Sequence, residues 1–253
     1  MIISLVWDRN QVRDYLDVAA MAECLGVTEA AAALCGVDGY YLDRSEEDDS
    51  VATVLVQRLA EPNPKDHTVI RQLSDYKGLT GKWQDWAVVT AACNDLAQRM
   101  LEGPAAMSVK FRNVTADPHD AVESWPYEAL VTALERGGLH EWQRIAAAVN
   151  AQPRGGVARA VEAYLAYARP YGVAPLMERA IASARRSAET EEKSAVAARI
   201  TELVSSSGLT RAAFAAAIGT SPSRLSTYCA GSVTPSAALM LRMERVAHRE
   251  TAS

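Results

Sequence analysis

The stretch that decides the fold reads ITELVSSSGLTRAAFAAAIGTSPSRLSTYCAGSVTPS and runs from Ile200 to Ser236. Near its middle, Thr210 offers a hydroxyl that can cap a helix over residues 211–218. Gly219 follows, and a tight turn with positive φ favours glycine. Ser221 can then cap another helix. The stretch therefore predicts two short helices joined by a glycine turn, which are the parts of a helix-turn-helix.

Flanking helices are predicted on both sides of this pair. Ile200, Leu203 and Val204 lie three and four residues apart, which is the spacing of one face of a helix. Gly231 ends the second short helix, and Pro235-Ser236 opens a further one. The apolar residues available there for a core are Leu239, Leu241, Met243 and Val246. Together these segments predict a domain of four to five helices.

This stretch resembles the Xre family of transcription regulators, the Cro and lambda-repressor type of helix-turn-helix. The matching residues are Gly208-Leu209-Thr210, Phe214-Ala215, Ile218-Gly219, Leu225-Ser226, Gly231 and Pro235-Ser236. The resemblance covers roughly the last fifth of the chain. The family often has Gln or Arg near the start of the third helix, where this chain has Pro222 and Ser223. That departure leaves fewer long hydrogen-bond donors for bases.

The resemblance implies that the helix over residues 221–230 enters the major groove of double-stranded DNA. It turns Ser223, Arg224 and Thr227 toward base edges, and an arginine side chain suits a guanine edge best. The N-terminus of the preceding helix is expected to contact phosphate. The DNA-binding residues predicted in this way are Thr210, Arg211, Ser221, Pro222, Ser223, Arg224 and Thr227. Because one such reader covers only a few base pairs, a homodimer on a two-fold site is expected.

Charge is distributed unevenly along the chain, whose formal net charge is -5. Residues 1–115 carry 11 basic and 17 acidic side chains, and residues 116–198 carry 9 and 11. Residues 199–253 carry 6 and 3, so the segment with the helix-turn-helix is the positive one. Phosphate attracts Lys and Arg, so DNA binding is predicted at the C-terminal end alone.

The rest of the chain is predicted to be mainly α, with a small β element near the N-terminus. Residues Ile2–Trp7 and 106–114 are rich in β-branched and apolar residues and are expected to pair as strands. Residues 51–59 fit either a strand or a short helix. Residues 82–102 are expected to form one long amphipathic helix.

Three parts are predicted along the chain. Residues 1–115 are expected to form an α+β domain that binds a partner or senses a ligand, and residues 116–190 a helical middle region. Residues 191–253 are expected to form the helix-turn-helix DNA-binding domain. A linker is placed at 115–122, and residues 185–193 are polar on all sides, as in a helix that bridges two bodies.

A second run, residues 16–30, resembles the small helix-turn-helix of excisionase-type and MerR-type proteins. Its second helix, residues 28–34, reads TEAAAAL and carries one acid and no Arg or Lys. Such a surface would repel phosphate, so this run is predicted to serve protein contacts or the core.

The sequence carries none of the common motifs for catalysis or cofactor binding. The sequence lacks GxGxxG, GxxxxGK[ST], HExxH and GxSxG, which predicts no enzyme and no cofactor. The four His residues have no ligand spacing, so no metal site is predicted. Four scattered cysteines without CxxC indicate buried free thiols in a reducing cytoplasm. No apolar run is long enough for a membrane span, and no signal peptide is expected.

These observations leave three functional hypotheses open. The first is a sequence-specific DNA-binding transcriptional regulator, a repressor that acts as a dimer and senses a ligand. The second is an antitoxin, since large Xre-type antitoxins join such a domain to a toxin-binding body and repress their own operon; the acidic N-terminal region would bind a basic toxin. The third is a scaffold protein whose helix-turn-helix no longer binds DNA.

Overall fold

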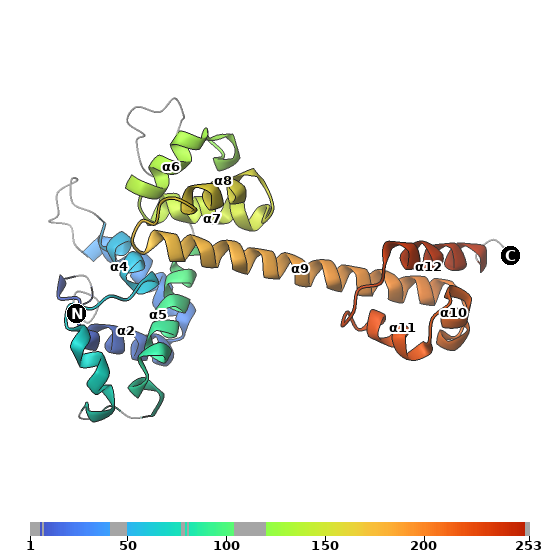
Figure 1. Ribbon diagram of the computed structural model, residues 1–253, viewed down its shortest axis with the longest axis horizontal. Helices are drawn as coiled ribbons and strands as arrows, with labels where there is room; N and C mark the ends of the chain where they lie inside the picture. The colour runs from blue at the N-terminus through green and yellow to red at the C-terminus, as the bar shows by residue number, and fades with distance from the viewer. Residues whose placement is uncertain are drawn as a thin grey trace. The chain divides into compact units, whose positions relative to one another are not determined.

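The computed structural model describes residues 6, 8–40, 50–76, 79, 81–103 and 120–250. These ranges contain helices and connecting segments and no strand. The chain separates into two compact units, Met1–Ala184 (unit 1) and Arg185–Ser253 (unit 2), drawn with their helix labels in Figure 1. The small N-terminal β element is therefore not supported: Val6 and Asp8 are helical. Its expected partner, 106–114, lies outside the described residues.

The two parts predicted for residues 1–190 share one core. Buried apolar side chains from Val6 to Ala184 form a single cluster. The predicted division at 115/116 falls outside the described residues, yet the residues described on either side of it belong to unit 1. Packing across the expected linker thus joins the first two predicted parts, because helices from both bury their apolar faces against each other.

The first half of unit 1 is built around one helix, α5 (Trp86–Leu101), which packs against three others. Those are α2 (Val12–Leu25), α3 (Val27–Cys35) and α4 (Val51–Ala60). The connecting 3-10 turns are η1 (Val37–Tyr40), η2 (His67–Asp75) and η3 (Gly81–Gln84). The buried face of α5 repeats every three or four positions, as a core helix requires: Val89, Cys93, Leu96 with Ala97, and Met100 with Leu101.

Capping side chains explain the structure of two segments. For one of them the sequence pattern fitted both a strand and a helix, and for the other it predicted a helix that starts too early. The segment 51–59 is helical, since the Ser50 hydroxyl accepts a hydrogen bond from the Thr53 amide at 3.1 Å and caps α4. The helix expected over 82–102 begins at Trp86. Asp85 caps it by accepting from the Ala87 amide at 2.8 Å, and the preceding residues form η3 instead.

Helices α2 and α3 meet at Gly26 with a bend of 120°. The buried residues of α3 are Ala30, Ala31 and Leu34, whereas Glu29 is exposed. Of the described helices, none by itself has the length and apolar character needed to cross a membrane. This bent pair passes the same test only when its two helices are taken together.

The second half of unit 1 comprises η4 (Val122–Ser124), α6 (Tyr127–Arg136), α7 (Leu139–Ala151), α8 (Gly156–Leu165) and the start of α9. Buried hydrogen bonds tie α7 to the first half. The Leu139 amide donates to Thr53 Oγ1 at 3.0 Å, and Gln143 Nε2 donates to the Met100 carbonyl at 2.8 Å. These bonds satisfy polar groups that would otherwise be buried without partners.

Helix α9 (Val173–Ser206) is continuous and contributes its two ends to different cores. Its first turns, through Ala184, belong to the unit 1 core, and Ile200, Leu203 and Val204 belong to the unit 2 core. Residues 189–195 between them are all exposed. With no apolar face to bury there, these turns depend on their own backbone bonds and on pairs such as Lys193–Glu189 at 2.7 Å.

The cysteines of the chain differ in exposure. Cys93 is buried, and burial raises the pKa of its thiol to about 12. Cys35 and Cys229 are half-buried, whereas Cys24 is exposed. The expectation that all four thiols are buried is therefore wrong for Cys24, which lies on the outer face of α2.

Gly172 immediately precedes α9 and lies close to α4. A substitution at this position tests how closely the two segments pack. It has φ +71°, and a Cβ there would lie 2.5 Å from the Gln57 Cα and carbonyl oxygen. We expect Gly172→Ala to lower the free energy of unfolding by about 2–5 kcal/mol, from the left-handed backbone and the clash together. Gly81→Ala is the control, because φ is +62° with no atom within 4 Å, and should cost about 1–2 kcal/mol. Equal losses in urea unfolding would contradict the close contact.

Glu141 on α7 makes stability depend on pH. The side chain is 5% exposed, and its carboxylate accepts from the Gly138 amide at 2.8 Å. Burial raises the pKa of this carboxyl above its ordinary value. Between the unfolded and the folded pKa, the native state keeps a proton that the unfolded chain has lost, so stability falls as pH rises through that window. We expect Glu141→Gln to flatten this slope in urea unfolding at pH 4 to 7; an unchanged slope would assign it to other groups.

Candidate nucleic-acid interface

Unit 2 is held together by a small core of its own. The helices are the end of α9, α10 (Arg211–Ile218), α11 (Pro222–Cys229) and α12 (Ala237–Glu250) (Figure 1). The buried residues of this core are Ile200, Leu203, Val204, Phe214, Ala215, Ile218, Leu225, Tyr228, Leu239, Met243 and Ala247. Leu241, expected in the core, is 52% exposed because it lies on the opposite side of α12 from Met243.

The start of α10 is fixed by Thr210. Its hydroxyl accepts from the Ala213 amide at 3.2 Å, which satisfies one of the free N–H groups of the first turn. Arg211 follows as the first residue of the helix and is exposed. The N-terminus of α10 therefore presents amide donors and one guanidinium to solvent, and both attract an anion.

The turn between α10 and α11 is secured by a residue from α12. Gly219 adopts φ +77°, where glycine carries no steric cost. Arg242 Nη1 donates to the Ile218 carbonyl at 3.1 Å and so satisfies a free carbonyl at the end of α10. Arg242 lies 23 residues after Gly219 in the sequence. The sequence gives no sign of this contact, because the bond forms only when α12 packs against α10.

Helix α11 is bounded as the sequence predicts. The Ser221 hydroxyl accepts from the Arg224 amide at 3.2 Å, and Pro222 occupies the first turn, where no amide donor is needed. Gly231 has φ +70° and its amide donates to the Tyr228 carbonyl at 3.1 Å. These features fix the length and the direction of the helix.

The exposed face of α11 is small and uncharged at its centre. Leu225 and Tyr228 are buried, which turns Ser223, Ser226 and Thr227 outward. Thr227 Oγ1 donates to the Arg224 carbonyl at 2.8 Å, within its own helix. Ser226 lies on the same face but is not among the DNA-binding residues predicted from the sequence. Its position three residues after Ser223, on the same side of a helix, is the signal that could have added it.

Arg224 lies at the edge of that face, beside Tyr228. Its Nε donates to the Tyr228 hydroxyl oxygen at 3.0 Å. The arginine is exposed, whereas the tyrosine is 5% exposed. The guanidinium is therefore attached to a side chain that the core holds in place.

The structure gathers the seven predicted residues on one contiguous segment from the start of α10 to α11, but gives them different tasks. The hydroxyls of Thr210 and Ser221 are engaged as helix caps, and Pro222 begins α11. Arg211 and Arg224 are the cations of the group. The chemistry this surface can perform is the donation of hydrogen bonds to an anionic or acceptor-rich partner.

Comparisons with known proteins agree with this geometry. Residues 195–249 match the model of a helix-turn-helix domain family. The chain carries a C-terminal helix-turn-helix domain. Such a domain indicates DNA binding and a role in transcription regulation. The matched residues make up about a fifth of the chain and include every predicted DNA-contacting residue.

Curated relatives of this chain are similar to it over about 98 residues. A mycolic acid-containing lipids exporter, MmpL11 of Mycolicibacterium smegmatis, is 34% identical over 98 residues, which are 39% of this chain and 10% of that protein. The heme uptake protein MmpL11 of Mycobacterium tuberculosis is 35% identical over 98 residues, with the same shares. The chain thus spans about a tenth of the length of these relatives. No solved structure matches the chain.

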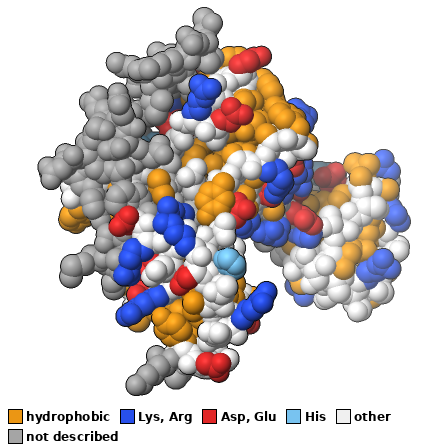
Figure 2. Space-filling view, turned by 60° about the vertical axis from the view of Figure 1, so that its left-hand side comes forward, with side chains coloured by type: hydrophobic (Ala, Val, Ile, Leu, Met, Phe, Trp, Pro, Cys, Tyr) orange, Lys and Arg blue, Asp and Glu red, His pale blue; other side chains and the backbone are white. Residues whose placement is uncertain are grey.

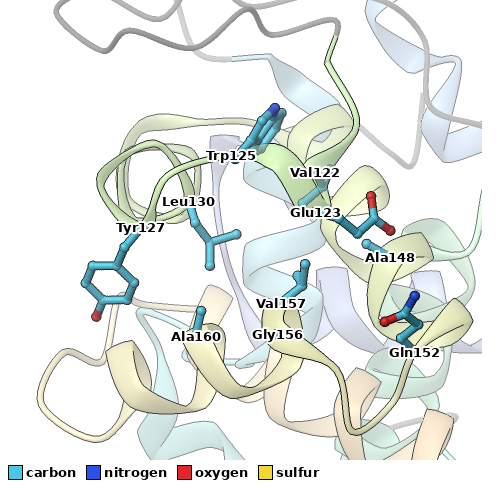
Figure 3. A pocket seen from close by; sticks show the side chains of 10 residues that line it. All are labelled: Val122, Glu123, Trp125, Tyr127, Leu130, Ala148, Gln152, Gly156, Val157 and Ala160. Carbon is cyan, nitrogen blue, oxygen red and sulfur yellow. The ribbon is translucent and has the colours of Figure 1, made fainter.

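Unit 1 contains a separate cavity of about 440 Å³. Figure 3 shows Leu130 of α6 and Val157 of α8 pointing into it, with Glu123 and Gln152 on one side and Tyr127 on the other. Its volume lies in the range of small-molecule sites. Across the described residues, no group of three or more His, Cys, Asp or Glu side chains is placed to hold a metal ion.

Surface charge on unit 1 is mixed. In the face shown in Figure 2, basic and acidic side chains are interspersed among polar and apolar ones. An interspersed surface gives no extended positive field of the kind that attracts a phosphate backbone. The described part of unit 1 in this view therefore shows no extended basic patch.

Ser221 and Ser223 are both exposed, but only Ser221 caps α11. Ser221→Ala removes the cap of α11 and should lower the local opening free energy by about 1 kcal/mol. Hydrogen exchange of the α11 amides should then be about fivefold faster. Ser223→Ala is the matched control. The Ser223 hydroxyl makes no hydrogen bond to another described residue, so its loss should leave exchange unchanged. Equal exchange in the two variants would remove Ser221 as a cap.

Proposed function

We propose that this protein is a sequence-specific transcriptional regulator that binds double-stranded DNA through α11. The observation that supports this most directly is the exposure of Arg211, Arg224 and Thr227, which lie on the domain matched by the helix-turn-helix family. The segment is in the positively charged part of the chain, with 6 basic and 3 acidic residues over 199–253. Positive charge next to the first-turn amide donors that the helix caps leave free is what binding to the phosphate backbone needs.

In this proposal the regulator is a repressor that binds as a homodimer. Helix α11 has about two turns, which reach only a few base pairs. Two copies on half-sites about one helical turn of DNA apart would supply the remaining contacts. A selected DNA sequence with two related half-sites supports the dimer, and a single short motif contradicts it.

Unit 1 is proposed to sense a ligand, because the cavity between α6 and α8 is large enough for a small molecule. The alternative function is an antitoxin, in which unit 1 binds and neutralises a basic toxin and the chain represses its own operon. That alternative is favoured by the acidic balance of residues 1–115. A small nuclease-like reading frame beside the gene supports the antitoxin, and an isolated gene supports the ligand-sensing repressor.

Arg211 provides the test of DNA binding. The full chain should bind duplex DNA from its own promoter with affinity that falls steeply as salt rises. We expect Arg211→Ala to weaken all sequences about equally and to reduce the slope of log affinity against log salt by about 0.9, because one phosphate contact is lost.

The control for this test is Arg199→Ala, which removes the same charge from the same unit. Arg199 lies on α9 and pairs with Glu202 at 3.2 Å. It should change the salt slope less than Arg211→Ala does. Binding that does not respond to salt at all would contradict the regulator and leave the scaffold hypothesis.

A further inference from the structure

The hydrogen bond between Arg224 and Tyr228 joins an exposed cation to a fixed support. Tyr228 is 5% exposed and belongs to the unit 2 core, together with Phe214 and Leu225. Its hydroxyl oxygen accepts from Arg224 Nε at 3.0 Å, one helical turn away. Because the ring is packed, the position of the hydroxyl is set by the core. The bond therefore restricts the long Arg224 side chain, which otherwise has many rotamers.

The N–H donors of Arg224 that are not bonded to Tyr228 determine which chemical group the side chain can bind. A guanidinium has five N–H groups, and the bond to Tyr228 uses the one on Nε. Among the described residues, no partner is recorded for the Nη1 and Nη2 donors of Arg224. The Tyr228 hydroxyl also keeps its own proton. The pair thus presents an array of donors without a free charged acceptor.

Of the four base-pair edges in the major groove, guanine fits such an array best. Guanine offers two adjacent acceptors, O6 and N7, whereas adenine and cytosine each present an amino donor and thymine a methyl group. With Nε engaged, the free end of the guanidinium carries Nη1 and Nη2 side by side. Those two nitrogens can donate to O6 and N7 together.

We propose that Tyr228 is a positioning residue that holds the Arg224 guanidinium end-on for one guanine of the operator. This inference rests on the proposed function, since it assumes that α11 lies in the major groove. Its physical basis is preorganisation: an arginine held in place before binding loses less rotational freedom when it binds. Tyr228 then determines specificity without contacting the base through its ring.

The experiment selects duplexes from a randomised DNA library with the full-length protein and compares four variants. Tyr228→Phe keeps the packed ring and removes the hydroxyl. Arg224→Lys keeps the charge and removes the two-nitrogen fork, and Arg224→Ala removes both. Tyr167→Phe, which removes an exposed tyrosine hydroxyl from unit 1, is the matched control. Circular dichroism checks that each variant is folded.

We expect the wild-type selection to contain one position fixed as guanine that Arg224→Ala and Arg224→Lys both lose. Tyr228→Phe should retain the same salt slope while its preference for guanine at that position falls about tenfold, the lower end of the range for a hydrogen bond that involves a charged group. Tyr167→Phe should select the wild-type sequence.

Three results would overturn the inference. An unchanged preference in Tyr228→Phe would remove Tyr228 from the specificity of the site. Uniformly tighter binding by Tyr228→Phe would mean that the bond holds Arg224 away from DNA. A loss in Arg224→Ala that is equal on all sequences, with a reduced salt slope, would assign Arg224 to phosphate. In all three the protein still binds DNA, whereas failure of the proposed function itself would appear as no salt-dependent binding by the wild type.

Discussion

The burial of Leu225 and Tyr228 is the interaction on which the proposed DNA-binding surface of α11 depends. These two side chains are the buried residues of α11, and they pack in a core shared with α9, α10 and α12. A helix of eight residues has little stability alone, so its orientation comes from this packing. Once the two residues are inside, the direction of every other side chain on α11 is fixed. The outward face with Ser223, Ser226 and Thr227 is a consequence of the inward one.

Polar contacts then fix the ends of the helices that the apolar core has oriented. Thr210 and Ser221 use their hydroxyls on the first turns of α10 and α11, and Arg242 satisfies the end of α10. The side chains that begin each helix are thus structural, and the remaining first-turn amides are the donors that we propose for phosphate. Arg224 receives its direction from Tyr228 in the same way. Stability and recognition in unit 2 use the same few side chains in different capacities.

Unit 1 also has capped helices, at Ser50 and Asp85, but most of its helices share one large apolar core. Its single apolar cluster combines helices from both sides of residues 104–119, and buried bonds from Leu139 and Gln143 of α7 reach Thr53 and Met100. The cavity lined by Leu130 and Val157 lies within the second half of this unit. The two roles proposed for unit 1, sensing a ligand and binding a protein, make different demands on this cavity and on the surface of the unit.

The sequence by itself determined the helix-turn-helix, because its signals are local. Thr210, Gly219, Ser221 and Gly231 act on backbone groups within a few residues, so the bounds of α10 and α11 could be read from them directly. Only the tertiary structure decided what depends on distant contacts. It turned Leu241 outward, brought Arg242 to the turn and bonded Arg224 to a tyrosine whose position the core sets. It also merged the first two predicted parts into one core, because packing between segments far apart in the chain leaves no periodic signal in either of them.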